Sequence, residues 1–280
     1  MESPEIYLAS SNMQRRDTIE LIVEFSCELS NVRGKCIDIG CGPGQITKDI
    51  LLPFLPEETE TVGADISEEM INYARKNYVD KRLSYIVMDI ESDLPSDQIE
   101  CYENVTSFYC LHWCKDIRRA FENIYKLLRP QGTALIMFLS YHVGFEAYLR
   151  LKENPRFQSY MQDVCRYCPY FQKKRYKDIK TSAEKMLIDT GFKSLHCSNR
   201  KKSFRYSKQS LGDSACAVNP FIKRLSDENL KKDFIEQFVK EITFLNQNVP
   251  LKKAKENQEE YVTLSYYVLV AYVQKPLSTA

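Results

Sequence analysis

The chain has 280 residues, of which 28% are charged and 44% hydrophobic. This length can bury a large core, and a single α/β domain with insertions is more natural than two independent domains. Lys and Arg number 39 against 38 Asp and Glu, and the net charge of +1 gives no bulk attraction to nucleic acid, so no nucleic-acid partner is expected.

The segment Lys35–Gly44 is a short apolar strand followed by a turn with glycines at three alternate positions. In the dinucleotide fingerprint the third glycine falls three residues after the second, and a phosphate binds at the helix N-terminus. Here Gly44 comes only two residues after Gly42, Pro43 between them lacks an amide donor, and Asp38 disfavours a phosphate anion. These features favour a cationic or zwitterionic ligand. The turn resembles the first motif of S-adenosylmethionine (SAM)-dependent methyltransferases, although such a turn can also serve only a tight connection.

The next strand, Thr61–Asp65, ends in an acid, and Ser67 is placed to cap a helix that begins at Glu68. Asp65 follows the glycine turn at about the 20-residue spacing at which an acid meets ribose hydroxyls in such folds. A carboxylate can accept two hydroxyl donors at once. The alternative is an acid that only complements the helix dipole, but Glu68 and its neighbour Glu69 already do so. Asp65 is therefore predicted to bind ribose.

A third strand, Leu83–Ile90, also has an acid near its end, Asp89. Asp89 is a candidate acceptor for the adenine amino group, with Ile90 beside the ring. The next elements are a strand at Val105–Cys110, a helix at Ile117–Leu128 that stops at the turn Arg129–Gly132, and an apolar strand at Thr133–Leu139. Apolar strands separated by helices predict a Rossmann-like, doubly wound α/β domain, with a mostly parallel sheet and ligand residues at the strand C-termini.

In the second half of the chain the apolar periodicity predicts three helical segments, within Phe145–Gln162, at Ser182–Thr190 and at Phe234–Phe244, and strands near Ser194–Cys197 and Phe204–Tyr206. The polar segment Asn246–Glu260 is expected to be a mobile loop. The last strand, Tyr261–Val273, is expected to pair antiparallel at the sheet edge. The chain is thus expected to be one methyltransferase domain, 1–280. It comprises a cofactor core at 1–140, lid and substrate-side elements at 141–260, and a closing edge strand at 261–274. The many aromatics at 141–171 resemble the lid insertions of the superfamily, although an apolar helix stripe is more often core.

Ten cysteines do not predict disulfides here. Three of them fall in or beside predicted core strands, where cysteine behaves as a small hydrophobe: Cys36, Cys41 and Cys110. Cys165 and Cys168 lack a second pair or a nearby histidine set, so no metal site is expected. His142 and His196 are isolated and are interpreted as structural or surface residues. Because the first residues lack a signal-peptide stretch and no run approaches membrane-spanning length, a cytoplasmic protein without membrane insertion is expected.

Several segments together resemble the insect juvenile hormone acid O-methyltransferases: Met13–Asp17, Asp65–Met70, Asn104–Trp113, Ala120–Tyr125, Ala217–Phe221 and Tyr267–Tyr272. The glycine turn specifies only the cofactor, whereas the Gln-Arg-Arg-Asp and Ser-Phe-Tyr-Cys-Leu-His-Trp runs indicate this narrower group. The resemblance covers nearly the whole chain. It implies a SAM-dependent carboxyl O-methyltransferase that converts a sesquiterpenoid acid, farnesoic acid or juvenile hormone acid, to its methyl ester. The alternatives are a relative that acts on another acid such as a fatty acid, and a catalytically silent paralogue that binds terpenoid or SAM.

By this resemblance Gln14 and Trp113 bind the substrate carboxylate, and both side chains offer N–H donors. Without it, Trp113 would be interpreted as a core anchor and Gln14 as an exposed helix residue. A carboxylate is already ionised near neutral pH, so no general base is needed and His112 is expected to position its loop. The predicted cofactor residues lie at the glycine turn and at the strand ends that follow: Asp38, Gly40, Cys41, Gly42, Gly44, Asp65, Ile66, Asp89, Ile90 and Cys110.

Overall fold

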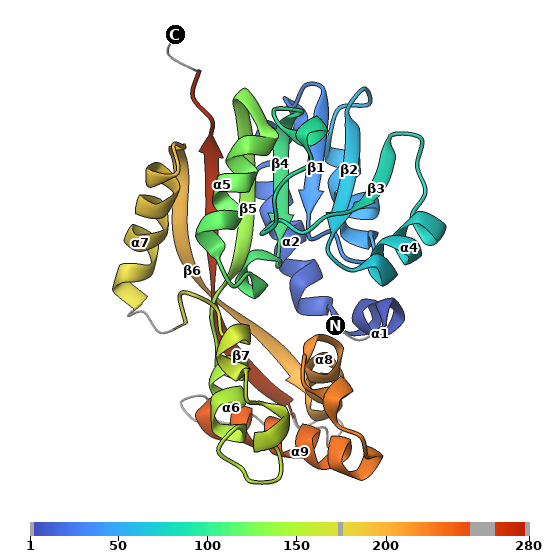
Figure 1. Cartoon of the computed structure of the whole chain (residues 1–280), viewed down its shortest axis with the longest axis vertical. Coiled ribbons are helices and arrows are strands. Elements are labelled where there is room, and N and C mark those ends of the chain that lie inside the picture. The colour runs from blue at the N-terminus through green and yellow to red at the C-terminus, as the bar shows by residue number, and fades with distance from the viewer. Residues whose placement is uncertain (1–2, 173–175, 247–260, 278–280) are drawn as a thin grey trace.

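A computed structural model of the protein describes residues 3–172, 176–246 and 261–277 (Figure 1). Within these ranges seven strands form one sheet in the order β3-β2-β1-β4-β5-β7-β6. The strands are β1 Lys35–Ile39, β2 Glu60–Asp65, β3 Leu83–Val87, β4 Tyr102–Phe108, β5 Leu128–His142, β6 Lys193–Ser207 and β7 Tyr261–Gln274. The α-helices are α1 Pro4–Ser10, α2 Asn12–Glu24, α3 Ser26–Ser30, α4 Glu68–Asn77, α5 Ile117–Leu127, α6 Val143–Leu151, α7 Tyr176–Asp189, α8 Lys208–Val218 and α9 Glu228–Leu245.

The sheet is parallel from β1 to β5, and β7 is antiparallel to both of its neighbours. This confirms the predicted Rossmann-like sheet with an antiparallel C-terminal strand. The prediction that this strand closes the sheet edge is wrong, because β7 lies between β5 and β6. The reason is burial: 268–271 in β7 is almost fully buried, which requires neighbours on both sides, whereas β6 is rich in Lys and Arg, as suits an edge strand.

Two strands are longer than predicted. The two short strands expected at Ser194–Cys197 and Phe204–Tyr206 are one strand, β6, that pairs with β7 along its length. Strand β5 begins at Leu128, because the predicted turn Arg129–Gly132 is a bulge against β4 inside the strand. Its left-handed residue is Gln131, at φ 70°, rather than the glycine expected there.

Helix boundaries also differ at their N-terminal ends. Helix α7 begins six residues before the predicted Ser182, and α9 begins at Glu228, where the Asp227 side chain accepts a hydrogen bond from the Leu230 amide. Most of the loop predicted at Asn246–Glu260 lies outside the described residues, as 247–260. In the described ranges no helix is long and apolar enough to cross a membrane. None of the ten cysteines, all of which lie in the described ranges, forms a disulfide.

Two hydrophobic cores cover opposite faces of the sheet, because successive strand side chains alternate between faces. In β5, the side chains of Leu135, Met137 and Leu139 join the core that contains α2. Those of Ile136 and Phe138 join the core that contains α5 and α7. A strand that is apolar at every position is therefore buried on both sides, as the unbroken run at Thr133–Leu139 predicted.

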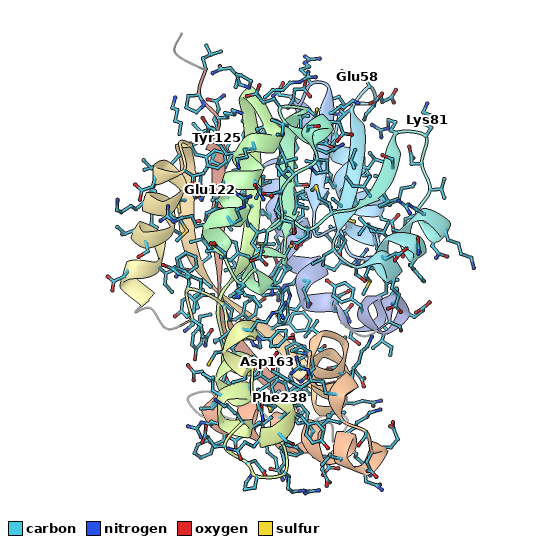
Figure 2. The ribbon with its side chains drawn as sticks, in the orientation of Figure 1. Glu58, Lys81, Glu122, Tyr125, Asp163 and Phe238 are labelled. Atoms are coloured by element: carbon cyan, nitrogen blue, oxygen red, sulfur yellow. The ribbon has the colours of Figure 1, made fainter. Side chains whose placement is uncertain are left out.

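A second region lies beyond the end of the parallel strands, where α6, α8 and α9 gather around the extended β6 and β7 (Figure 1). The pairing of β5 with β7 ends at His142 opposite Tyr266, whereas β6 and β7 remain paired as far as Ser207 and Tyr261. Aromatic side chains fill this helical region. Tyr148 stacks on Phe238, labelled in Figure 2, with ring centroids 4.8 Å apart. The helical region therefore stands over the edge of the sheet at which the glycine turn lies.

Candidate functional site

One cavity of about 380 Å³ connects the strand ends of the sheet with the helical region. At the sheet end it is lined by Gly40, Gly42, Asp65, Ile66, Asp89, Ile90 and Cys110. At the other end the lining side chains include Phe145 and Tyr148 from α6, Leu211 and Ala215 from α8, and Phe238 and Ile242 from α9. Seven of the ten predicted cofactor residues thus meet in a single cavity of ligand size.

The predicted ribose acid, Asp65, also organises the glycine turn. Its Oδ2 accepts a hydrogen bond from the Gly42 amide at 2.9 Å, and its Oδ1 accepts one from the Ser67 amide at 2.9 Å. Burial raises the pKa of Asp65, and the two amide bonds act against that rise. Each carboxylate oxygen keeps a second lone pair for a ligand hydroxyl. Ser67 caps α4 as predicted, because its Oγ accepts from the Met70 amide.

Two glycines of the turn serve different purposes. At Gly40, φ is +76°, and an added Cβ would lie 2.3 Å from the Cβ of Cys110, so a glycine lets the end of β4 approach the turn. Gly44 was predicted to bind cofactor, but it does not line the cavity. An added Cβ there would lie 2.7 Å from the Tyr85 hydroxyl and 2.9 Å from the Ala74 Cβ, so Gly44 permits close packing behind the turn.

Asp38 and Cys41 lie beside the cavity rather than on it. They line a smaller hollow of about 30 Å³, which shares Tyr7, Gln14, Gly40 and Tyr109 with the large cavity. Asp38 accepts hydrogen bonds from the hydroxyls of Thr47 at 2.6 Å and Thr106 at 2.9 Å. Burial raises the pKa of Asp38 to about 6, although both hydroxyl bonds oppose the rise. Asp38 therefore supports the turn from within the core.

Gln14 and Trp113 both line the cavity, and they come from different elements. Gln14 lies on α2, where its carbonyl accepts a hydrogen bond from the Thr18 hydroxyl at 2.8 Å. Trp113 ends the short 3₁₀ helix Leu111–Trp113 after β4. Its ring centroid lies 4.9 Å from that of His112 and 5.8 Å from that of Phe145. The fold thus places two N–H donors, distant in sequence, on one cavity.

Two histidines line the same cavity, and both are neutral at physiological pH. Burial lowers the pKa of His112 to about 3, with a smaller contribution from His142. Among the described residues its Nδ1 has no hydrogen-bond partner. Burial lowers the pKa of His142 to about 4. The Nδ1 of His142 accepts a hydrogen bond from the Gly144 amide at 3.0 Å, so its neutral ring carries the proton on Nε2.

His142, interpreted from the sequence as an isolated structural or surface residue, has a structural role and also lines the cavity. It ends the apolar strand β5 and caps α6, the helix that follows. Its position in the sequence, a polar residue between an apolar strand and a helix rich in aromatic residues, is the pattern that could have indicated a residue of the ligand site. Two further lining residues had no predicted site role: Tyr7 on α1, which belongs to the family resemblance and lines both hollows, and Tyr206 at the end of β6. No local pattern links these residues to the glycine turn.

The charges of the cavity match a cationic or zwitterionic ligand. Asp65, Asp89 and Glu91 line its sheet end, and among the described lining residues the one Lys or Arg is Arg166, in the helical region. A phosphate would find no cationic partner at the glycine turn. In the described ranges, no group of three or more His, Cys, Asp or Glu side chains is placed to hold a metal ion.

Comparison with known proteins gives a consistent picture. Residues 37–136 match the methyltransferase domain family. The chain is 31% identical to the juvenile hormone acid O-methyltransferase of Bombyx mori over 283 residues, which cover 98% of both chains. It is 31% identical to the enzyme of the same name from Drosophila melanogaster over 284 residues, covering 98% of this chain and 93% of that one. A Bacillus halodurans protein named as a candidate methyltransferase shares the fold, with a TM-score of 0.57 at 16% identity over 93% of this chain and 99% of that chain.

Proposed function

The chain belongs to the juvenile hormone acid O-methyltransferase family and is a SAM-dependent O-methyltransferase, and we propose that its acceptor is a sesquiterpenoid acid, farnesoic acid or juvenile hormone acid. The observation that carries the proposal is the shape of the cavity. It joins an acid-lined glycine turn to an aromatic helical region, with Gln14 and Trp113 on its wall. A cofactor and a long apolar acid would meet where these two donors are found.

The acidic and apolar residues at the sheet end of the cavity support this proposal, because they suit the polar groups and the ring of SAM. Asp65 would accept the ribose hydroxyls and Asp89 the adenine amino group, with Ile66 and Ile90 against the adenine ring. Gly42 would leave room for the ligand beside the turn, because an added Cβ there would have no atom within 4 Å. When bound, SAM supplies an electrophilic methyl group on its positively charged sulfur. The acidic side chains of this end favour that charge over a phosphate.

The acceptor end would hold a carboxylate without changing its protonation state. The acid is already ionised at neutral pH, so no side chain needs to remove a proton. The Gln14 amide and the Trp113 indole would each donate a hydrogen bond to it and direct one oxygen towards the methyl group. His112 and His142 are uncharged, so neither would form an ion pair that weakens the carboxylate as a nucleophile.

The helical region would bind the hydrocarbon chain of the acid. Its lining residues come mainly from apolar and aromatic side chains of α6, α8 and α9. Each methylene group transferred from water to such a wall contributes about 0.8 kcal/mol. A long terpenoid chain would therefore gain most of its binding free energy there, while the carboxylate sets its orientation.

The test is a panel of carboxylic acids incubated with methyl-labelled SAM and analysed for methyl esters. Farnesoic acid, juvenile hormone acid, a saturated fatty acid of similar length and a short aromatic acid would be compared by kcat/KM. We expect the two sesquiterpenoid acids to give the highest values. A higher value for the fatty acid would assign the enzyme to another acid class. No ester from any acid, with SAM bound, would favour a silent terpenoid-binding paralogue.

A further inference from the structure

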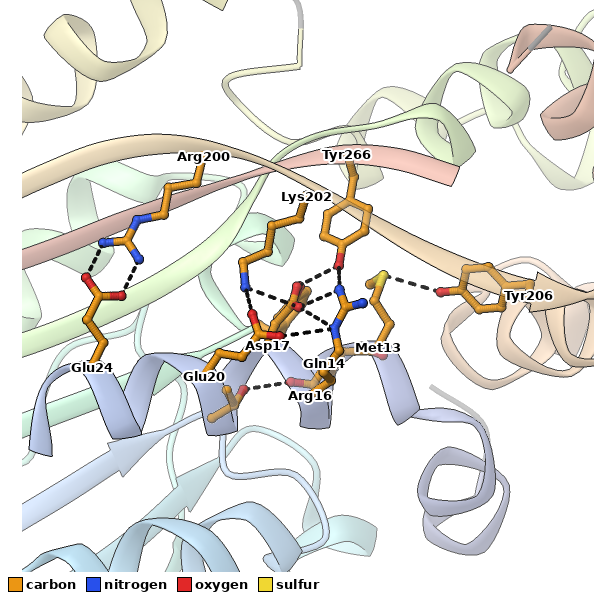
Figure 3. A network of polar contacts seen from close by, with 12 residues as sticks. Met13, Gln14, Arg16, Asp17, Glu20, Glu24, Arg200, Lys202, Tyr206 and Tyr266 are labelled. Carbon is orange, nitrogen blue, oxygen red and sulfur yellow. Dashed lines mark hydrogen bonds and ion pairs between the residues drawn. The ribbon is translucent and has the colours of Figure 1, made fainter. Parts of the chain in front are cut away.

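We infer that Asp17 is a positioning residue for the acceptor, because its buried carboxylate fastens α2, and with it Gln14, to the junction between the sheet and the helical region. The inference concerns the placement of α2 and rests on the proposed function only for the identity of the acceptor. Asp17 belongs to the Gln-Arg-Arg-Asp run, in which only Gln14 has a proposed role. Figure 3 shows Asp17 at the centre of a polar network that joins α2 to β6 and β7.

The carboxylate of Asp17 is fully buried, and donors surround both of its oxygens. Its Oδ2 accepts hydrogen bonds from the hydroxyls of Tyr109 at 2.5 Å and Tyr266 at 2.7 Å. Its Oδ1 accepts from the guanidinium of Arg16 at 2.8 Å and from the ammonium of Lys202 at 3.3 Å. A buried carboxylate is tolerated only with such partners. Hydrogen bonds from these four side chains fix the position of the Asp17 carboxylate.

The network is closed and electrically balanced. The Arg16 guanidinium also donates to the Tyr266 hydroxyl at 2.8 Å, and Lys202 donates to Glu20 at 2.6 Å. Two carboxylates therefore face two cations, and the Tyr266 hydroxyl bridges Arg16 to Asp17. Removal of a donor would leave the buried Asp17 carboxylate without one of its partners, which costs more than the loss of an exposed pair.

The strand partners of Asp17 lie where the sheet gives way to the helical region. Lys202 of β6 and Tyr266 of β7 are opposite each other, and Tyr266 is also opposite His142, at the end of the β5–β7 pairing. Beyond this point β6 and β7 continue towards the helical region (Figure 1). Asp17 thus links α2 to the strands that carry the acceptor end of the cavity.

Asp17 is linked to two residues that line the cavity, Gln14 and Tyr109. Gln14 lies three residues earlier on α2, which is one helical turn and the same face. Tyr109 also lines the cavity, with its backbone at φ 55°, a left-handed conformation that is unfavourable for a residue with a side chain. The hydrogen bond to Asp17 fixes the Tyr109 side chain on this left-handed backbone. Loss of the carboxylate would therefore loosen both Gln14 and Tyr109.

A second ion pair between the same helix and the same strand provides a matched control. The Glu24 carboxylate accepts hydrogen bonds from the Arg200 guanidinium of β6 at 2.5 and 2.8 Å, as Figure 3 shows. Neither residue lines the cavity, and the Glu24 side chain is 46% exposed. Glu24→Gln therefore removes an α2–β6 ion pair without touching the acceptor end.

The experiment compares Asp17→Asn, Tyr266→Phe and Glu24→Gln with the wild type. Tyr266 does not line the cavity, and Phe keeps its buried ring, so this variant is expected to fold even if Asp17→Asn does not. Three quantities are measured: kcat/KM for farnesoic acid, affinity for S-adenosylhomocysteine by calorimetry, and acrylamide quenching of Trp113, the single tryptophan of the chain. Quenching measures how accessible the Trp113 ring is to solvent, and it requires no substrate.

We expect Asp17→Asn to lower kcat/KM roughly ten- to hundredfold and Tyr266→Phe by a smaller factor, as for the loss of hydrogen bonds to a charged group. Trp113 quenching should rise in both variants, cofactor affinity should stay within about twofold, and Glu24→Gln should match the wild type. Folded variants with unchanged kinetics and quenching, or with cofactor affinity reduced in parallel with activity, would overturn the inference. If the wild type methylates no acid, the proposed function fails, and a rise in quenching confined to Asp17→Asn and Tyr266→Phe would still support the placement of α2.

Discussion

The Gly42 amide donates a hydrogen bond of 2.9 Å to the Asp65 carboxylate, so the acid that ends β2 holds the glycine turn that follows β1. The two residues lie on neighbouring parallel strands, whose carboxyl ends meet at one edge of the sheet. One side chain therefore shapes the turn with part of its hydrogen-bonding capacity and offers the remainder to a ligand. Its loss should affect both.

We predict that Asp65→Ala lowers the affinity for S-adenosylhomocysteine by about 1–3 kcal/mol, because the ribose hydroxyls lose a charged acceptor. Isothermal titration calorimetry measures the change directly. Glu68→Ala is the control, since Glu68 is an exposed acid three residues further on that does not line the cavity. Equal affinity in the folded Asp65 variant and the wild type would place the cofactor site elsewhere.

We predict that Gln14→Ala and Trp113→Phe each reduce methyl ester formation by about 1.5–3 kcal/mol in kcat/KM, because each removes a donor to the charged carboxylate. Cofactor affinity should barely change. The double variant should lose less than the sum of the single losses if both donors orient one carboxylate. Arg15→Ala, an exposed neighbour on α2, is the control. Wild-type rates in both single variants would exclude these residues from the site.

The pH dependence of kcat/KM for a carboxylic acid substrate should show no limb near 6.5 that is assignable to His112. The pKa of His112 is about 3, because burial disfavours its charged form, so the ring stays neutral throughout the usual assay range. An acid limb near pH 4 would belong to protonation of the substrate carboxyl. Activity that follows a group of pKa near 6.5 in the wild type, and not in a folded His112→Asn variant, would instead indicate a general base.

Stability should depend on pH through His142. Its folded pKa of about 4 lies below the unfolded value of 6.5, so between these values the unfolded chain binds more protons. The free energy of unfolding should therefore fall as pH drops from 6.5 to 4, by at most about 1.4 kcal/mol per pH unit. His142→Asn keeps a helix-capping side chain and removes this titration.

The measurement is urea unfolding of the wild type and His142→Asn at several pH values. Asp38 titrates in the opposite sense, because its folded pKa is raised to about 6, but its contribution is common to both proteins and cancels in their difference. The stability gap should change in favour of His142→Asn as pH falls. A gap that stays constant from pH 7 to pH 4 would contradict a buried neutral histidine.

We predict that Ala215→Phe discriminates against long acids. Ala215 is buried on α8 and lines the cavity in the helical region, away from the glycine turn. A larger ring there should lower kcat/KM for farnesoic acid by roughly 1–3 kcal/mol through lost space. A short aromatic acid and S-adenosylhomocysteine serve as internal controls, because neither should reach this wall. Equal losses for short and long acids would remove α8 from the acceptor site.

Features set by neighbouring residues could be predicted from the sequence. The cap of α4 by Ser67, the acid at the end of β2 and the burial of β5 on both faces follow from side-chain chemistry and short periodicities. The family resemblance of the Gln-Arg-Arg-Asp run likewise needed only residue identity. For the same reason most of the predicted cofactor residues do line one cavity, since parallel strands bring their ends to one edge.

The tertiary structure alone decided which distant segments meet. In it β7 lies inside the sheet, Tyr7 and His142 line the cavity, and Gly44 does not. The Asp17 carboxylate accepts hydrogen bonds from Tyr109, Lys202 and Tyr266, which lie far from it in the sequence. These outcomes depend on which apolar surfaces pack against each other and on which hydrogen-bond donors surround a buried charge. Both are properties of contacts between residues far apart in the chain, and no local pattern of the sequence carries them.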